Sequence, residues 1–261
     1  MNDRSAFELF GSQNPYSSAL ALRNSSYMAW IDQELVRLLD SREPTARARF
    51  MHDAFRTFIG SGRYPCLGAK AAVNKGTYRF GVYRSLASLG ASAGLARDLC
   101  AFAFERPHIE GDYVTFVATF DDLDYLDERR FERALWAQLQ ALSDLDGPNH
   151  AWDPTVDADP ESKRFAFSFA GTAFFVVGMH PGSSRLARRF SWPTLIFNAH
   201  SQFQALRDNG RYGRFVDAVR ARELNLQGCV NPNLAQFGER SEASQYGGRA
   251  VEDGWKCPFR P

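Results

Sequence analysis

The sequence predicts an α+β fold, in which helices flank a central, mainly antiparallel sheet behind a helical N-terminal region. Three observations predict it. Apolar residues recur at helical spacing through much of the first 60 residues. Apolar side chains alternate through Asp112–Phe120, as in a strand with one buried face. Two later strand-like segments adjoin at Ala170-Gly171, which indicates a hairpin.

The expected helices follow from this spacing. In the N-terminal region they cover Ala19–Leu39 and Glu43–Phe58, the second with Pro44 at its first position. Asp127–Leu145 carries its apolar side chains on one side, as an amphipathic helix does. The other expected helices lie near Gly94–Glu105 and over Ser201–Asp208 and Arg214–Leu224.

The expected strands are short apolar segments bounded by turn residues. Besides Asp112–Phe120 they are Thr77–Tyr83, the two hairpin strands Arg164–Phe169 and Thr172–Met179, and Pro193–Asn198. After Gln227 the periodicity ends, and glycine, asparagine, serine and proline predominate.

The bulk composition is that of an ordinary globular protein. The chain has 261 residues, of which 44% are hydrophobic and 23% charged, so we expect a single domain over residues 1–261. A formal net charge of +1 provides no field that attracts nucleic acid or an anionic membrane, and neither is expected as a partner. The 22 Phe, 9 Tyr and 5 Trp suit a thick core, and equally a pocket for a flat cofactor.

The sequence also predicts a compartment. The segment MNDRSAFELFGSQ has no basic region followed by an apolar run, so no signal peptide is expected. The longest apolar stretch, Ala173–Met179, is too short to span a bilayer. Four widely spaced cysteines are typical of reduced thiols. Together these features predict a cytoplasmic protein.

Polar residues gather in the last third of the chain. His180 follows an apolar strand and precedes Arg185, Arg188 and Arg189. Such a histidine could ligate a metal or act as a base, and arginines bind carboxylates and phosphates. The alternative is a capped turn that leads into a surface helix. Asn198 and His200 flank the end of an expected strand, where active-site residues often lie, although a histidine at this position more often begins a helix.

One N-terminal motif also points to chemistry. Cys66, Gly68 and Ala72 have the spacing Cys-x-Gly-x-x-x-Ala, which resembles the proximal-ligand segment of cytochrome P450 enzymes. A cysteine thiolate on haem iron favours O–O cleavage. The alternative is a buried structural thiol that opens a helix. Walker, GxGxxG and HExxH motifs are absent from the sequence.

Taken together, these segments resemble the YqcI/YcgG family, from about Pro65 to Phe259. The motifs that carry the resemblance are Tyr64-Pro65-Cys66 through Ala71, His180-Pro181 through Arg185, Arg188-Arg189-Phe190, Phe197-Asn198 with His200 and Gln202-Phe203, Asn231-Pro232, Ser241 through Tyr246, and Trp255 through Phe259. This family includes haem-dependent N-hydroxylases of guanidino compounds.

The resemblance implies haem b, dioxygen and an external electron-donor reductase. The implied enzyme is a monooxygenase that N-hydroxylates a guanidino group of arginine or of another guanidine. Cys66 is then the expected iron ligand, with His180 and Cys257 as the alternatives. Two other functions stay open: a haem-binding sensor or carrier without turnover, and a haem-free enzyme that uses His180 and Glu242.

The resemblance also implies roles for the remaining polar residues. Arg185, Arg188 and Arg189 are expected to bind haem propionates or a substrate carboxylate. Glu242 is the expected guanidinium partner, because a carboxylate accepts two parallel N–H bonds. Asn198, Gln245 and Tyr246 would complete the substrate shell. His180, where it is not the ligand, would supply protons to bound dioxygen.

Overall fold

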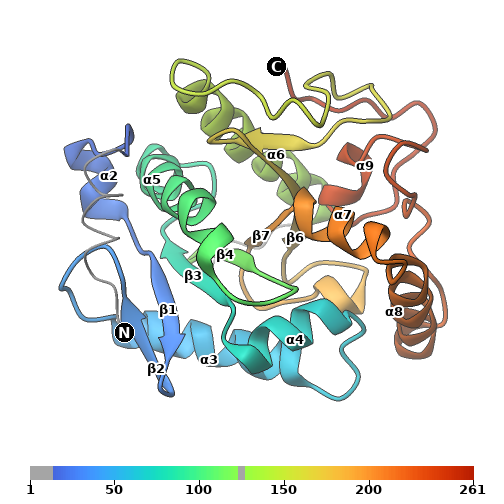
Figure 1. Ribbon diagram of the computed structural model, residues 1–261, viewed down its shortest axis with the longest axis horizontal. Coiled ribbons are helices and arrows are strands. Elements are labelled where there is room, and N and C mark those ends of the chain that lie inside the picture. The colour runs from blue at the N-terminus through green and yellow to red at the C-terminus, as the bar shows by residue number, and fades with distance from the viewer. Residues whose placement is uncertain (1–13, 123–126) are drawn as a thin grey trace.

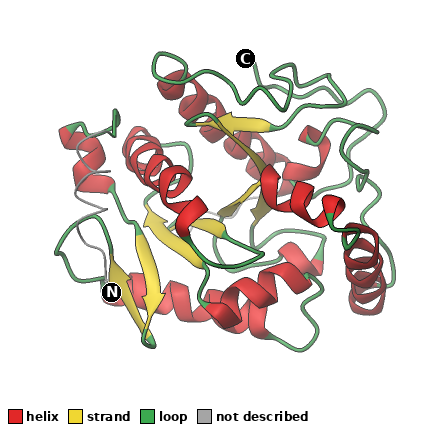
Figure 2. Ribbon diagram, in the orientation of Figure 1, coloured by secondary structure: helices red, strands yellow, loops and turns green. Residues whose placement is uncertain are grey.

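The computed structural model describes residues 14–122 and 127–261, which form one seven-stranded sheet with helices on both faces (Figures 1 and 2). The strands are β1 (Met28–Ile31), β2 (Glu34–Arg37), β3 (Tyr78–Tyr83), β4 (Thr115–Phe120), β5 (Phe167–Phe169), β6 (Thr172–Met179) and β7 (Thr194–Ala199). The helices are α2 (Ala19–Asn24), α3 (Ala46–Gly60), α4 (Leu67–Lys75), α5 (Leu89–Glu105), α6 (Glu128–Asp146), α7 (His200–Asp208), α8 (Tyr212–Gln227) and α9 (Ala243–Tyr246), with 3₁₀ turns at Arg106–His108 and Leu186–Arg188.

The strand order is β2-β1-β3-β4-β7-β6-β5, and both halves of the chain contribute strands. Neighbouring strands are antiparallel except β3 and β4. These two are parallel because α5 connects them, and a helical crossover returns the chain to the same end of the sheet. The expected α+β class with a mainly antiparallel sheet is therefore confirmed.

One face of the sheet is closed by α5 and α6, which lie above it in Figure 1. Asp127 caps α6 by accepting a hydrogen bond from the Arg130 backbone N–H, and the buried positions of this helix then recur every three or four residues. They meet phenylalanines that point from alternate strand positions, such as Phe116, Phe174 and Phe197. We call this side the closed face.

The other face is covered by α3 and α4, which lie below the sheet in Figure 1, and by α8 at the side. Thr45 caps α3, and the buried residues of this helix pack on Tyr78 and Phe80 of β3. Of the 16 residues of α8, all of which the structure describes, only Glu223 is buried. The cover on this side is therefore thinner, and we call it the cavity face.

The N-terminal region differs from the prediction. The helix expected over Ala19–Leu39 is wrong beyond Asn24, because β1 and β2 form a hairpin there. Its turn holds Asp32 and Gln33 at φ 48° and 66°, the left-handed conformation that two-residue hairpin turns require. The Ser26 backbone N–H donates to the buried Asp98 carboxylate, a contact that helical spacing does not reveal.

Two further expectations need correction. Pro44 precedes the N-cap Thr45 and does not occupy the first helical position. All six residues of β4 are buried, since helices cover both faces of the sheet, whereas the alternation in Asp112–Phe120 predicted one buried face. The other expected helices and strands are present within a few residues of their predicted bounds.

Two findings bear on the compartment. Across the described part of the chain, every helix is too short or too polar to cross a membrane. The segment 1–13, on which the expectation about a signal peptide rests, lies outside the described residues.

Candidate functional site

A cavity of about 290 Å³ lies on the cavity face, between the sheet and helices α4, α7 and α8. Its floor is a row of side chains that share one face of three paired strands: Thr115 of β4, Asn198 of β7 and Phe175 of β6. Ile196 and Val177 form the next row. The walls are mostly apolar, as is usual for pockets that bind small molecules and cofactors.

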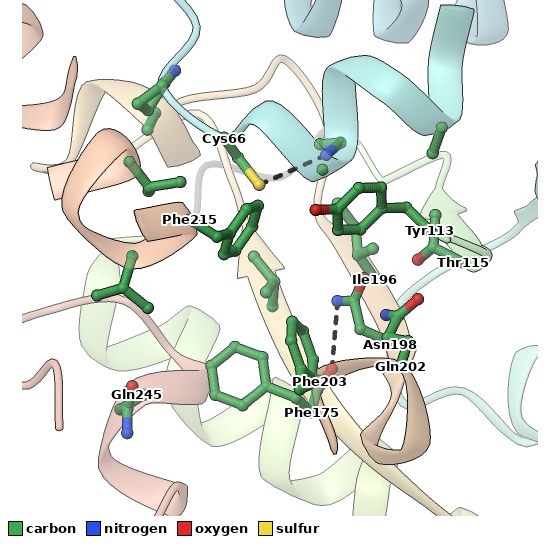
Figure 3. Close-up of a pocket in the computed structure, with 18 of the residues that line it drawn as sticks. Cys66, Tyr113, Thr115, Phe175, Ile196, Asn198, Gln202, Phe203, Phe215 and Gln245 are labelled. Carbon is green, nitrogen blue, oxygen red and sulfur yellow. Dashed lines mark hydrogen bonds between the residues drawn. The ribbon is translucent and has the colours of Figure 1, made fainter. Parts of the chain in front are cut away.

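Cys66 lies in the wall opposite this floor, and its sulfur points into the cavity (Figure 3). The residue is the N-cap of α4, and its Sγ accepts a hydrogen bond from the Ala69 backbone N–H at 3.5 Å. Burial raises the pKa of the thiol, while the backbone N–H groups of Ala69 and Gly68 oppose that shift. The ligand-free thiol is therefore protonated at neutral pH, and two backbone donors are ready to stabilise a thiolate.

An aromatic pair borders the thiol. Tyr113 and Phe215 stack with ring centroids 5.6 Å apart, and Figure 3 shows both rings near the Cys66 sulfur. A side chain at Gly68 would overlap the Tyr113 ring, since an added Cβ would lie 2.8 Å from it. Glycine at this position therefore allows the ring to close against α4.

Polar groups line the floor of the cavity. The Asn198 side chain donates to the Phe175 carbonyl at 3.3 Å, and the Gln202 amide oxygen accepts from the Val114 backbone N–H at 3.1 Å. Gln245 of α9 also lines the cavity, and its amide nitrogen donates to the Ala235 carbonyl at 3.4 Å. Asn198 and Gln202 are held by their strand and helix, and each retains amide atoms that can face a ligand.

Glu242 and His200 form a buried pair in the cavity wall. The Nε2 atom of His200 lies 3.0 and 2.9 Å from the two carboxylate oxygens of Glu242. His200 opens α7 at the end of β7, and Glu242 directly precedes α9. Burial raises the pKa of Glu242, whereas the hydrogen bond from His200 and the charge of Arg207 act in the opposite direction.

Three arginines line the cavity: Arg188, Arg207 and Arg220. Among the described residues none of them forms an ion pair with a carboxylate. Arg188 is half-buried and donates to the carbonyls of Gly178 and Tyr246, and desolvation lowers its pKa to about 10. The Arg207 guanidinium lies over the Tyr212 ring, 4.3 Å from its centroid. The cavity therefore has an excess of positive charge, which suits an anionic ligand.

Of the predicted site residues, the structure brings Cys66, Arg188, Asn198, Glu242 and Gln245 together in the wall of this cavity. Tyr246 is adjacent but turned toward the core, where its hydroxyl donates to the Phe174 carbonyl and accepts from the Phe167 N–H. It therefore supports the sheet edge.

His180 and Cys257 lie elsewhere. His180 is fully buried on the closed face, and its ring stacks on Phe131 with centroids 4.3 Å apart. Cys257 packs against the aromatic core of that face, and burial raises its pKa to about 12. Neither residue is part of the cavity lining.

Arg185 and Arg189 hold the loop after β6. Arg185 pairs with Glu223 at 2.5 Å and donates to the Cys229 carbonyl at 2.9 Å. Arg189 donates through Nε to the Ser183 carbonyl at 2.7 Å. Both guanidinium groups are engaged with the protein, and neither lines the cavity.

Sequence reasoning missed the wall that α8 provides. Tyr212, Phe215, Val216 and Val219 face the cavity at helical spacing. The amphipathic pattern of α8 was readable in the sequence, but a stripe of this kind usually packs in a core. Tyr113 and Arg207 belong to no recognised motif, and the sequence favoured the start of a helix over a site residue at His200.

Comparison with known proteins identifies the family. Residues 55–260 match the YqcI/YcgG family. The chain belongs to this family. That range includes the thiol, the pair His200–Glu242 and all of α8, so the whole cavity lies within the part that family members share.

Two relatives come from Bacillus subtilis (strain 168). The chain is 30% identical to the uncharacterized protein YcgG over 159 residues, which are 57% of this chain and 62% of the relative. It is 27% identical to the uncharacterized protein YqcI over 135 residues, or 49% of this chain and 52% of the relative. The chain thus spans less than two thirds of each relative's length. No solved structure matches it significantly.

Proposed function

We propose that this YqcI/YcgG protein is a haem-dependent monooxygenase that N-hydroxylates a guanidino group. The observation that carries the proposal is the position of the Cys66 thiol. It points into an apolar cavity whose wall also holds a buried carboxylate, Glu242. The reaction needs a thiolate to bind the haem iron and a carboxylate to bind the guanidinium in the same pocket.

The residues of the cavity fit a haem. Cys66 would bind the iron, and the N–H groups of Ala69 and Gly68 would tune the sulfur, as donors to a ligating thiolate do. The flat rings of Tyr113 and Phe215 offer surface for a macrocycle. Arg207 and Arg220, which form no ion pair with a carboxylate among the described residues, would hold the propionates. When bound, haem would supply the activation of dioxygen.

The net reaction inserts one oxygen atom into an N–H bond, and the other oxygen atom leaves as water. Two electrons from an external reductase and two protons complete the balance. Glu242 would bind the guanidinium, since a buried carboxylate pairs strongly with a planar fork of N–H donors. Asn198 and Gln245 would orient the rest of the substrate, and the apolar walls would exclude water.

The test begins with the spectrum of the purified chain after expression with a haem precursor. We expect a Soret band, and a ferrous–CO band well to the red of that of an imidazole-ligated haem. Cys66→Ala should abolish that CO band. Cys257→Ala is the matched control and should leave the spectrum unchanged, because this thiol packs against the core of the closed face and does not line the cavity.

Two results would contradict the proposal. A chain without a Soret band binds no haem. An unchanged CO spectrum in Cys66→Ala, together with its loss in His180→Ala, would identify His180 as the ligand. Turnover separates an enzyme from a sensor or carrier: with dioxygen and reductant, an enzyme consumes a guanidine such as arginine and forms its N-hydroxy product, whereas a sensor or carrier leaves the guanidine unchanged.

A further inference from the structure

The pair His200–Glu242 has a geometry that the proposed function does not by itself require. One nitrogen, Nε2 of His200, lies within hydrogen-bond distance of both oxygens of Glu242. A single N–H is therefore shared between both carboxylate oxygens. Each oxygen keeps further lone pairs that can accept hydrogen bonds from a ligand. The side chains of the two residues are 11% and 7% exposed, so solvent contributes little to either.

The surroundings hold the imidazole in this orientation. The Phe237 ring packs edge-on against it, with centroids 4.8 Å apart. His200 is also fixed by the backbone, because it lies where β7 ends and α7 begins. Glu242 comes from a different part of the chain, 42 residues later. The contact between them joins α7 to the segment before α9.

We propose that His200 is a positioning residue, which holds Glu242 ionised and oriented so that it can bind a cation in the cavity. The inference rests on the proposed function only in naming that cation as a guanidinium. The imidazole acts through Glu242. The Nε2–H of the imidazole donates to the carboxylate and so favours its ionised form.

Cation binding then has a defined pH dependence. Other groups that act on Glu242 are Arg207 from α7 and Tyr246 from α9, while Arg164 lies over the Phe237 ring. Binding should strengthen as pH rises and Glu242 loses its proton. Removing the His200 donor should move the deprotonation of Glu242 to higher pH. Burial raises the pKa of this carboxyl, and the hydrogen bond from His200 would no longer oppose that effect.

The decisive experiment needs no ligand. The infrared carbonyl band of protonated Glu242, identified by its absence in Glu242→Gln, is followed against pH in the chain as purified. We expect His200→Leu to shift its midpoint upward. His200→Gln should reverse most of that shift and bring the midpoint back toward that of the unsubstituted protein, because a glutamine amide can donate from nearly the same position as Nε2. A midpoint that is equal in His200→Leu and the unsubstituted protein would overturn the inference, as would identical behaviour of the leucine and glutamine variants.

A second measurement tests the consequence for binding. With L-arginine as the probe and calorimetry as the readout, His200→Leu should weaken binding roughly tenfold to hundredfold at neutral pH, the usual range for a hydrogen bond to a charged group. The loss should shrink at higher pH and vanish in a Glu242→Gln background. A loss of equal size in that background would mean that His200 acts otherwise than through Glu242. Failure of the unsubstituted protein to bind haem or arginine would count against the proposed function, and the infrared titration would still decide the role of His200.

Discussion

The two faces of the sheet carry similar side chains but are used differently. On the closed face, α5 and α6 bury phenylalanines from the strands in a continuous core. On the cavity face, α8 covers the strands with little burial of its own residues and leaves a space of about 290 Å³. Aromatic richness alone therefore does not locate a site. Seven residues of α6 are buried over the core, whereas one residue of α8 is buried over the cavity.

The largest expected effect comes from two neighbours on β6. Phe174 points into the closed face and is fully buried, whereas Phe175 lines the cavity. Phe174→Ala should lower the free energy of unfolding by about 3–5 kcal/mol, because it leaves a void in a packed core. Phe175→Ala should cost clearly less and should mainly weaken ligand binding. Urea unfolding of both variants measures this, and equal losses would show that the cavity face is packed like a core.

A glycine on each face offers the next comparison. An added Cβ at Gly178 would lie 2.7–2.8 Å from Phe131, Leu135 and the Tyr246 carbonyl, so Gly178→Ala should cost about 1–3 kcal/mol by overpacking. At Gly68 the near neighbour is the Tyr113 ring, which can move toward the cavity.

Gly68→Ala should therefore cost less stability than Gly178→Ala but reduce haem uptake, as measured by the Soret absorbance per chain. Gly62→Ala is the control, since nothing lies within 4 Å of its added Cβ. Normal haem uptake in Gly68→Ala would contradict the assignment of Tyr113 to the haem pocket.

Each face of the sheet has a buried carboxyl group whose pKa is raised: Asp98 on the closed face and Glu242 on the cavity face. Burial raises the pKa of Asp98 to about 6, against hydrogen bonds from Ser25, Ser26 and Tyr83. The pKa of Asp98 in the folded protein exceeds the unfolded value of about 4. Proton binding to Asp98 therefore stabilises the folded state below pH ~4, and this stabilisation is lost as pH rises through 6.

Asp98→Asn should remove that component, so the difference in unfolding free energy between variant and parent should change between pH 4 and 7. Parallel pH profiles would contradict the shift. Because all these partners belong to the protein, a cavity ligand should leave the titration of Asp98 unchanged while it alters that of Glu242.

The smallest expected effect concerns α8, the helix that covers the cavity. Arg222 of α8 donates to the carbonyls of Gly62 and Tyr64, next to the Cys66 segment. Arg222→Ala should lower global stability by only about 1 kcal/mol but should speed amide hydrogen exchange along α8 relative to α6. Arg214→Ala, on the exposed side of the same helix, should leave the exchange unchanged. Equal hydrogen exchange of α8 in Arg222→Ala and Arg214→Ala would show that the hydrogen bonds of Arg222 do not stabilise the position of α8 over the cavity.

By itself the sequence determined the local elements and the family. Helical spacing over Asp127–Leu145 and the turn Ala170-Gly171 predicted α6 and the β5–β6 hairpin, because short-range periodicity and turn residues are local properties. The motifs around Cys66, Asn198 and Glu242 were sufficient to predict the family. The same local reasoning failed at Ala19–Leu39, where a long-range hydrogen bond from Ser26 to Asp98 accompanies a hairpin in place of a helix.

Only the tertiary structure decided which polar residues meet. His180 and His200 each come after a predicted strand, yet His180 stacks on Phe131 in the closed face and His200 pairs with Glu242 in the cavity. The reason is geometric: which face of the sheet a residue joins after a strand ends depends on the path of the chain, which spacing does not encode. Cys66 and Glu242 lie 176 residues apart in the chain, and packing of α4, α7 and α8 on one face of the sheet places both in the wall of one cavity.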